Sequence, residues 1–195
     1  MTIGNSNSNI VLNVLQDYWN ELSWACGDDT GSVSGLCPIP QRLSFNPMKI
    51  HRQLQHVYIG ELKSDDFLEV RLSGTAIDAD AGFSLKGSNY LDICPPVDRK
   101  FYVAICKAVV GWPCGMKMVR RVTLKNGRIH QYSSLSLPLS DCEGVPRYIV
   151  GMVNIAKDIA HGGFPYPEKM TSQISDFQFL DIGAGVPPLP DFLRL

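Results

Sequence analysis

The stretch FLEVRLSGTAIDADA, residues 67–81, is the part of the sequence that decides the fold. In its first half, polar residues alternate with the apolar Leu68, Val70 and Leu72. A period of two residues is typical of a half-buried strand. On the polar face of this strand Arg71 could hold an anion, but its expected role is to pair with Glu69 or with a carboxylate of a helix.

A change of direction is predicted where this strand ends. Gly74 has no Cβ, so it can turn the chain where other residues would clash. Thr75 suits the N-cap of a short helix, and Asp78 can bond back to the N–H of the cap. Gly82 suits the end of that helix. We therefore expect a hinge, formed by Arg71, Gly74, Thr75 and Asp78, where a sheet passes into the helices that cover one of its faces.

Several short motifs follow one another in order over about residues 14–158. The Arg71-Leu72-Ser73-Gly74-Thr75 motif precedes a loop bracketed by glycines, from Gly82-Phe83 to Lys86-Gly87. The other motifs are Tyr18-Trp19, Pro40-Gln41-Arg42, Asn46-Pro47 and Leu137-Pro138-Leu139. Together they resemble the landmarks of a bacterial PAS-like family of short proteins. The resemblance implies a five-stranded antiparallel sheet. It indicates the fold and the class of protein more clearly than it indicates a ligand.

The composition is that of an ordinary globular protein. Of the 195 residues, 45% are hydrophobic and 19% are charged, and the formal net charge is −1. Surfaces that bind nucleic acid are usually strongly basic, so nucleic acid is not an expected partner. No apolar run approaches the ~20 residues of a membrane span. The start, MTIGNSNSN, lacks the basic residue of a secretory signal, so we expect a cytoplasmic protein.

The order of predicted elements defines the fold class. Helices are predicted from the spacing of apolar residues at 10–24 and 98–111, with Asp98 as a possible cap of the second. A helix at 46–54 is predicted because Asn46 can cap it and Pro47 suits its first position. Strands are predicted at 56–62, 67–73, 114–125, 128–139 and 147–155. This order predicts an α+β fold, a PAS-like five-stranded antiparallel sheet with helices on one face. The expected divisions are an N-terminal helix and loop extension at 1–45, a PAS-like domain at 46–160 and a C-terminal tail at 161–195.

The C-terminal tail, residues 161–195, is rich in proline and glycine, so no long regular element is expected there. It nevertheless carries the apolar residues Phe177, Phe179, Leu180 and Ile182. We interpret it as an extended tail that packs on the domain or on a partner, with disorder as the alternative.

Two cofactors known from PAS-like relatives are disfavoured. Flavin-binding relatives carry a reactive cysteine in a loop that resembles residues 87–91, and Tyr90 stands at that position here. Haem-binding relatives often use a histidine of the long helix, and residues 98–111 contain none. Cys106 could ligate iron, although a small buried hydrophobe is its expected role. No metal site is expected, because the six cysteines and four histidines lack ligand spacing.

A small-molecule pocket between the long helix and the sheet remains possible. Its candidate lining residues are Asn89, Tyr90, Phe101, Ile105, Cys106 and Leu135. A largely apolar cavity with a few polar groups is the usual form of a ligand site. The alternative is that these side chains simply fill the core.

The helix predicted at 10–24 has more apolar surface than one packing face requires. This excess suggests a homodimer in which Leu12, Leu15 and Trp19 meet across a two-fold axis, as symmetric pairs are the commonest oligomers. The alternative is that the open face of the sheet or the C-terminal tail covers them.

The function expected from the sequence is that of a sensory or protein-interaction module and not of an enzyme, because no catalytic motif is present. Such a module would act in bacterial signalling through an unknown partner protein or through self-association. One alternative is a protein whose purpose is to bind a small molecule. A remote alternative is a redox sensor or thiol enzyme that uses Cys94 or Cys106, although nothing beside either cysteine favours a thiolate.

Overall fold

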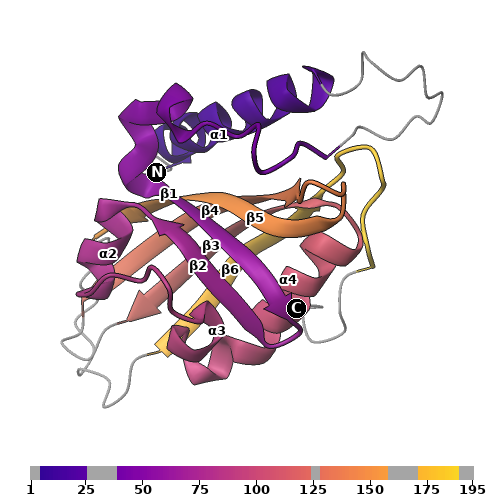
Figure 1. Cartoon of the computed structure of the whole chain (residues 1–195). Coiled ribbons are helices and arrows are strands. Elements are labelled where there is room, and N and C mark those ends of the chain that lie inside the picture. Colours follow the sequence, from indigo (N-terminus) through magenta and orange to yellow (C-terminus); the bar gives the residue numbers. More distant parts are fainter. Residues whose placement is uncertain (1–4, 26–38, 124–127, 158–170, 189–195) are drawn as a thin grey trace.

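A single antiparallel sheet lies at the centre of the computed structural model, which describes residues 5–25, 39–123, 128–157 and 171–188 (Figure 1). The strands are β1 (Val57–Ser64), β2 (Phe67–Ser73), β3 (Gly115–Thr123), β4 (Ile129–Ser140), β5 (Pro146–Ala156) and β6 (Thr171–Leu180). Their order across the sheet is β2-β1-β5-β4-β3-β6. The helices are α1 (Asn5–Ala25), η1 (Pro47–His56), α2 (Thr75–Ala81), α3 (Tyr90–Ile93), η2 (Pro96–Asp98) and α4 (Arg99–Gly111). The α+β class is confirmed.

The sheet has six strands, one more than the sequence predicted. The added strand, β6, pairs antiparallel with β3 along its whole length, from Gly115 opposite Leu180 to Thr123 opposite Thr171. The expectation of no long regular element in the tail was therefore wrong. The prolines of the tail lie outside residues 171–180, so the interior of β6 can pair freely. Its apolar side chains pack against the domain, as the sequence indicated.

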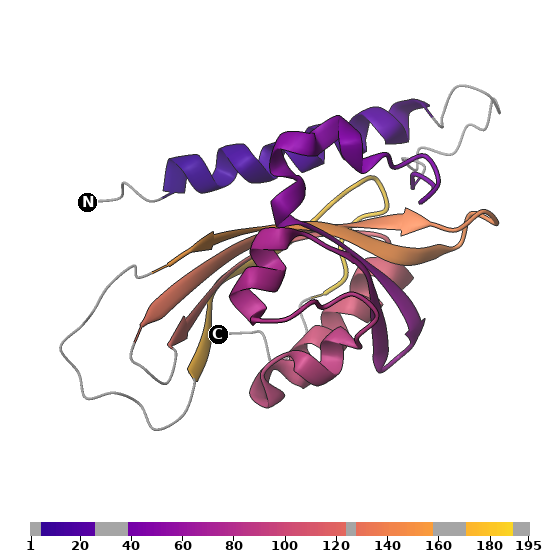
Figure 2. The ribbon, with the colours of Figure 1, turned by 60° about the vertical axis from the view of Figure 1, so that its left-hand side comes forward.

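Helix α1 covers one face of the sheet, and α3 and α4 lie on the other (Figure 2). Leu12, Leu15 and Trp19 are 4%, 0% and 1% exposed, because they pack on the sheet side chains of their own chain. The Trp19 indole also donates a hydrogen bond to the Pro138 carbonyl at 2.8 Å. The prediction that these three side chains form a dimer interface was therefore wrong. The alternative, cover by the open sheet face, is what the structure shows.

The chain turns after β2 at the predicted position, but the cap and the hydrogen bonds of the turn differ from those predicted. Gly74 itself is the N-cap of α2, with extended φ and ψ of −72° and 151°, and no side chain of the described residues makes a capping hydrogen bond there. Thr75 is exposed and is the first helical residue, so its predicted capping role was wrong. Asp78 accepts a hydrogen bond from the amide of Leu85 at 3.1 Å instead of bonding back to the cap. Gly82 ends the helix in the left-handed region, as expected.

The turn at Gly74 requires glycine because two backbone segments meet there. A Cβ at this position would lie 2.6 Å from the Leu54 carbonyl oxygen and closer still to that of Gln55. The Gly74 amide also donates to the carbonyl of Val57 at 2.8 Å. Close approach, and not an unusual φ, is therefore the reason for glycine at the hinge.

Within the described part of the chain, none of the helices combines the length and the apolar character that a membrane span demands.

Candidate functional site

A cavity of about 380 Å³ lies between the sheet and the helices α2, α3 and α4. Strand alternation decides which side chains reach it. On β4, for example, Ser134 and Ser136 line the cavity, while Leu135 and Leu137 belong to the core under α1. Most of the lining is apolar and includes Leu68, Val70, Ile105, Val109, Met116 and Met118. The cavity is therefore an apolar chamber with a few polar groups.

Three of the six predicted pocket residues line this cavity. Tyr90, Ile105 and Cys106 are brought together by α3 and the inner face of α4. The ring of Tyr90 meets that of Tyr102 edge-on, with centroids 5.2 Å apart. Burial is the main cause of the raised pKa of Tyr90, so this phenol stays neutral at ordinary pH.

The other three predicted residues lie elsewhere. Leu135 faces α1 on the opposite side of the sheet, because it directly follows the cavity-lining Ser134 and neighbouring residues of a strand point to opposite faces. Phe101 packs edge-on against Phe177 of β6, with centroids 5.6 Å apart. Asn89 is structural: its side-chain oxygen caps α3 and accepts a hydrogen bond from the Leu68 amide at 3.0 Å.

A buried ion pair lies at one end of the cavity. The Arg120 guanidinium is 3.2 Å from the Asp98 carboxylate, and these side chains are 11% and 10% exposed. The guanidinium also lies over the rings of Tyr102 and Tyr132, 5.7 and 5.0 Å from their centroids. Burial alone would lower the pKa of Arg120, but Tyr102, Tyr90 and Asp98 outweigh it and raise the pKa. Arg120 is therefore a permanent positive charge on the cavity wall.

A second polar group is centred on Asp80 of α2. It accepts a hydrogen bond from the Tyr132 hydroxyl at 2.8 Å. One oxygen of the same carboxylate lies 3.3 Å from His130 Nδ1 and 3.4 Å from Lys157 Nζ. Asp80 and Tyr132 both line the cavity, so this group joins α2 to the sheet at the cavity wall.

Three buried polar atoms of the cavity wall have no hydrogen-bond partner among the described residues. They are Arg120 Nε, which is a donor, and the hydroxyl oxygens of Ser73 and Ser134, which can donate or accept. By contrast, the neighbouring Ser136 shares a hydrogen bond of 2.6 Å with the Tyr58 hydroxyl. Buried polar atoms normally have partners, so these three are the groups that a bound molecule could satisfy.

The comparison of this chain with protein families matches the model of a PAS domain over residues 8–154. The chain belongs to the PAS domain family. Among solved structures it is similar to one described as the structure of an RNA-binding light-oxygen-voltage receptor, at 16% identity and a TM-score of 0.41. That match covers 63% of this chain and 36% of the other, so this chain spans about a third of that protein. A comparison with curated proteins finds no match.

The polar wall of this PAS domain was not found from the sequence. Met116, Met118 and Arg120 share one face of β3, so an arginine on an apolar strand face was the available signal. Asp98 was interpreted as a helix cap, yet it makes no capping bond and pairs with Arg120.

The thiols beside the cavity are poor nucleophiles. Burial and the nearby Cys94 raise the pKa of the Cys106 thiol to about 12. Burial and the charge of Asp98 raise the pKa of Cys94 as well. A thiol attacks as the thiolate, so neither cysteine is set up for the redox or thiol-enzyme chemistry considered for the sequence.

Proposed function

We propose that this PAS domain is a sensory module that binds a small molecule in the cavity between its sheet and α4. The molecule would have an apolar body and an acceptor oxygen that lies against Arg120 and Ser134. The observation that carries this proposal is the presence of unpartnered buried polar atoms, among them Arg120 Nε and Ser134 Oγ, in a mostly apolar cavity.

The size and lining of the cavity support this function. Its volume of about 380 Å³ lies within the range of small-molecule sites, and apolar walls supply most of the affinity of such sites. The Nε–H of Arg120 offers a charged donor, which makes a stronger hydrogen bond than a neutral donor does. Since Asp98 already balances the charge of Arg120, a carbonyl oxygen would suit the position as well as a carboxylate would.

The output of the module would come from a partner protein or from a second copy of the chain. Sensing suits the site better than thiol-based catalysis does, because the cavity thiols Cys94 and Cys106 have raised pKa values. We place this role in bacterial signalling, as the resemblance of the sequence implies.

Native mass spectrometry of the purified protein tests whether a molecule is bound. A set of simple probes then tests the chemistry: octanoate has an apolar body with an acceptor group, and octylamine has the same body with a donor group. We expect octanoate to bind saturably in calorimetry and octylamine to bind at least about tenfold more weakly, because the carboxylate can accept from Arg120.

The matched variants are Ser134→Leu, which adds bulk inside the cavity, and Ser175→Leu on the exposed side of β6. The first should abolish octanoate binding and the second should leave it unchanged. The proposal would be overturned by protein that carries no bound molecule and shows no saturable binding of octanoate, or by equal binding of both probes.

A further inference from the structure

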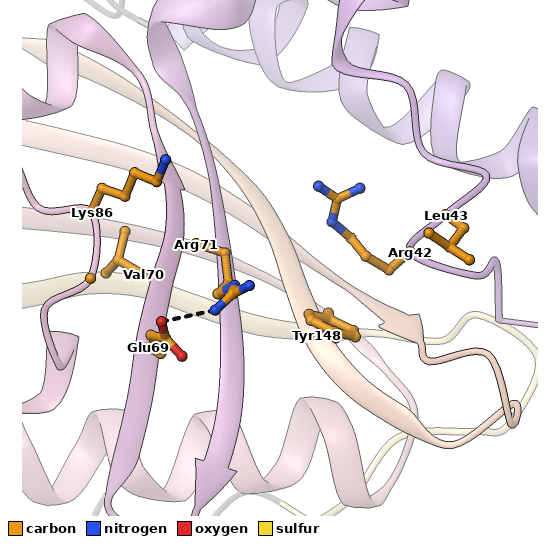
Figure 3. A pocket seen from close by; sticks show the side chains of 8 residues that line it. Arg42, Leu43, Glu69, Val70, Arg71, Lys86 and Tyr148 are labelled. Atoms are coloured by element: carbon orange, nitrogen blue, oxygen red, sulfur yellow. Dashed lines mark hydrogen bonds and ion pairs between the residues drawn. The ribbon is translucent and has the colours of Figure 1, made fainter.

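A second hollow, of about 450 Å³, lies beside β2 (Figure 3). We call it the basic groove. Its lining residues are Arg42, Leu43, Glu69, Val70, Arg71, Lys86, Gly87 and Tyr148. Glu69 and Arg71 alternate along β2 with Leu68 and Val70, so their side chains emerge on the face of the sheet opposite the cavity. Val70, on this edge strand, borders both hollows.

Positive charge is in excess in this groove. Arg71 is already paired, with Glu69 at 2.9 Å and with Glu61 at 3.6 Å. Neither Arg42 nor Lys86 forms an ion pair within the part of the chain that the structure describes. The Nη1 of Arg42 makes a 3.3 Å hydrogen bond to the Phe45 carbonyl, which positions the guanidinium without neutralising it. Two rim cations are therefore available to a negatively charged partner.

The two available cations do not converge on one point. Figure 3 shows Arg42 and Lys86 on opposite sides of Arg71, with Tyr148 on the Arg42 side. A single small anion would contact one rim at a time. A longer molecule with successive negative groups could contact both rims, and this arrangement therefore favours a chain over an isolated ion.

An apolar surface accompanies these charges. Leu43 is 82% exposed at the Arg42 rim, and the ring of Tyr148 is partly exposed beside it. Aromatic side chains and arginine are the residues that protein interfaces favour. The groove thus combines charged positions at its rims with an apolar contact between β5 and the Arg42 loop.

Three separate sequence motifs meet in this groove. Arg42 ends the Pro40-Gln41-Arg42 motif, Arg71 begins the motif that contains the hinge, and Lys86 belongs to the glycine-bracketed loop. The backbone of that loop is fixed against β2, because the Gly87 amide donates to the Val70 carbonyl at 2.8 Å. Main-chain hydrogen bonds therefore hold the backbone beside Lys86 against β2. The position of this loop does not depend on the Lys86 side chain.

We propose that the basic groove binds an acidic segment of a partner protein in an extended conformation. Carboxylates of the segment would lie against Arg42 and Lys86, and one of its apolar side chains would lie against Tyr148 and Leu43. This inference goes beyond ligand sensing, because it concerns a different surface. It assigns to the fold a place where a signalling partner is recognised.

The test uses two synthetic peptides that are identical except that one carries glutamates where the other carries lysines. Binding is followed by the shifts of backbone amides in NMR spectra of the full chain. We expect the glutamate peptide to shift residues 69–71, 86–87 and 148 saturably. Binding should weaken as salt is added, because exposed charges are screened.

The matched variants carry equal changes of charge. Arg42→Glu combined with Lys86→Glu should weaken binding of the glutamate peptide about tenfold, since rim charges contribute modestly one by one. Lys49→Glu combined with Lys100→Glu changes exposed residues outside the groove and should leave the affinity within about twofold. Lys86→Glu alone is at an exposed loop position, so it keeps the test valid if the double variant fails to fold.

Three results would overturn the proposal. They are equal binding of both peptides, unchanged binding by the Lys86→Glu variant, and acetate that shifts the same amides with the affinity of the peptide. The last result would identify a site for small anions and not a docking groove. Failure of octanoate to bind the cavity would leave this test unaffected.

Discussion

The Arg120 guanidinium of β3 lies 3.2 Å from the Asp98 carboxylate at the start of α4, and both side chains are largely buried. The pair links the sheet to its main helix at the polar end of the cavity. A buried charge that loses its partner is far more costly than an exposed one. The same pair therefore serves both the stability of the fold and the chemistry of the site.

Replacing Arg120 by Met should lower the free energy of unfolding by about 3–5 kcal/mol, because Asp98 would remain buried without a partner. Changing both residues to apolar ones should restore much of the loss. Arg99→Met is the control, since Arg99 pairs with the exposed Asp92 and should cost below about 1 kcal/mol. Urea unfolding measures all three, and equal losses for Arg120→Met and Arg99→Met would contradict the role of the buried pair.

The hinge glycine should tolerate no side chain. Gly74→Ala should cost about 3 kcal/mol, because its Cβ would clash with the backbone oxygens of Leu54 and Gln55. Gly111→Ala is a matched control: it lies at the end of α4 with open space around its Cβ, and it should be neutral or stabilising by up to about 1 kcal/mol. Thr75→Ala should be nearly neutral, since the N-cap of α2 is Gly74 and not Thr75. Thermal unfolding would refute this view of the hinge if Gly74→Ala matched the wild type.

Helix α1 should be part of the folded core and not a detachable dimer element. Trp19→Ala should cost about 3–5 kcal/mol, because a fully buried ring is removed and the Pro138 carbonyl loses its donor. Asn20→Ala, at an exposed position of the same helix, should change stability by less than about 0.5 kcal/mol. A Trp19→Ala variant with the stability of the wild type and a reduced molecular mass in light scattering would instead support the dimer interface.

The accessible thiols should be alkylated selectively. With iodoacetamide at pH 8, Cys142 should react in the native protein, because it is exposed. Burial raises the pKa of Cys106 and Cys114 to about 12, so these residues stay protonated as the pH rises through 8 and should react only after unfolding. Peptide mapping distinguishes these sites from Cys26 and Cys37, which lie outside the described residues. Rapid labelling of Cys106 in the native protein would instead support a redox sensor or thiol enzyme that uses this cysteine.

The sequence was most informative where a local pattern determines a local structure. The alternation of Leu68 and Val70 identified β2, and a glycine marked the corner after it. The physical reason for Gly74 could not be read from the sequence, because its backbone contact involves residues about twenty positions earlier. Long-range approach of two segments leaves no local pattern.

The cavity was predicted only in part because its lining depends on strand register and on the sixth strand. Leu135 was placed in the pocket because it is apolar, yet a shift of one residue along a strand moves a side chain to the other face. Phe101, which the sequence predicts in the cavity, packs on Phe177 of β6, a strand that the sequence did not predict. β6 was not predicted because the tail as a whole is rich in proline and glycine, although residues 171–180 contain no proline.

The central claim is that the cavity between the sheet and α4 binds a small molecule through its apolar wall and Arg120. The most direct test is a titration of the full chain with octanoate, followed by the methyl signals in NMR spectra. We predict saturable shifts for Met116, Met118 and Ile105, which line the cavity, and unchanged signals for Leu137 and Val150 on the α1 face. Equal shifts on both faces, or no saturable shift of the cavity methyls, would contradict the account.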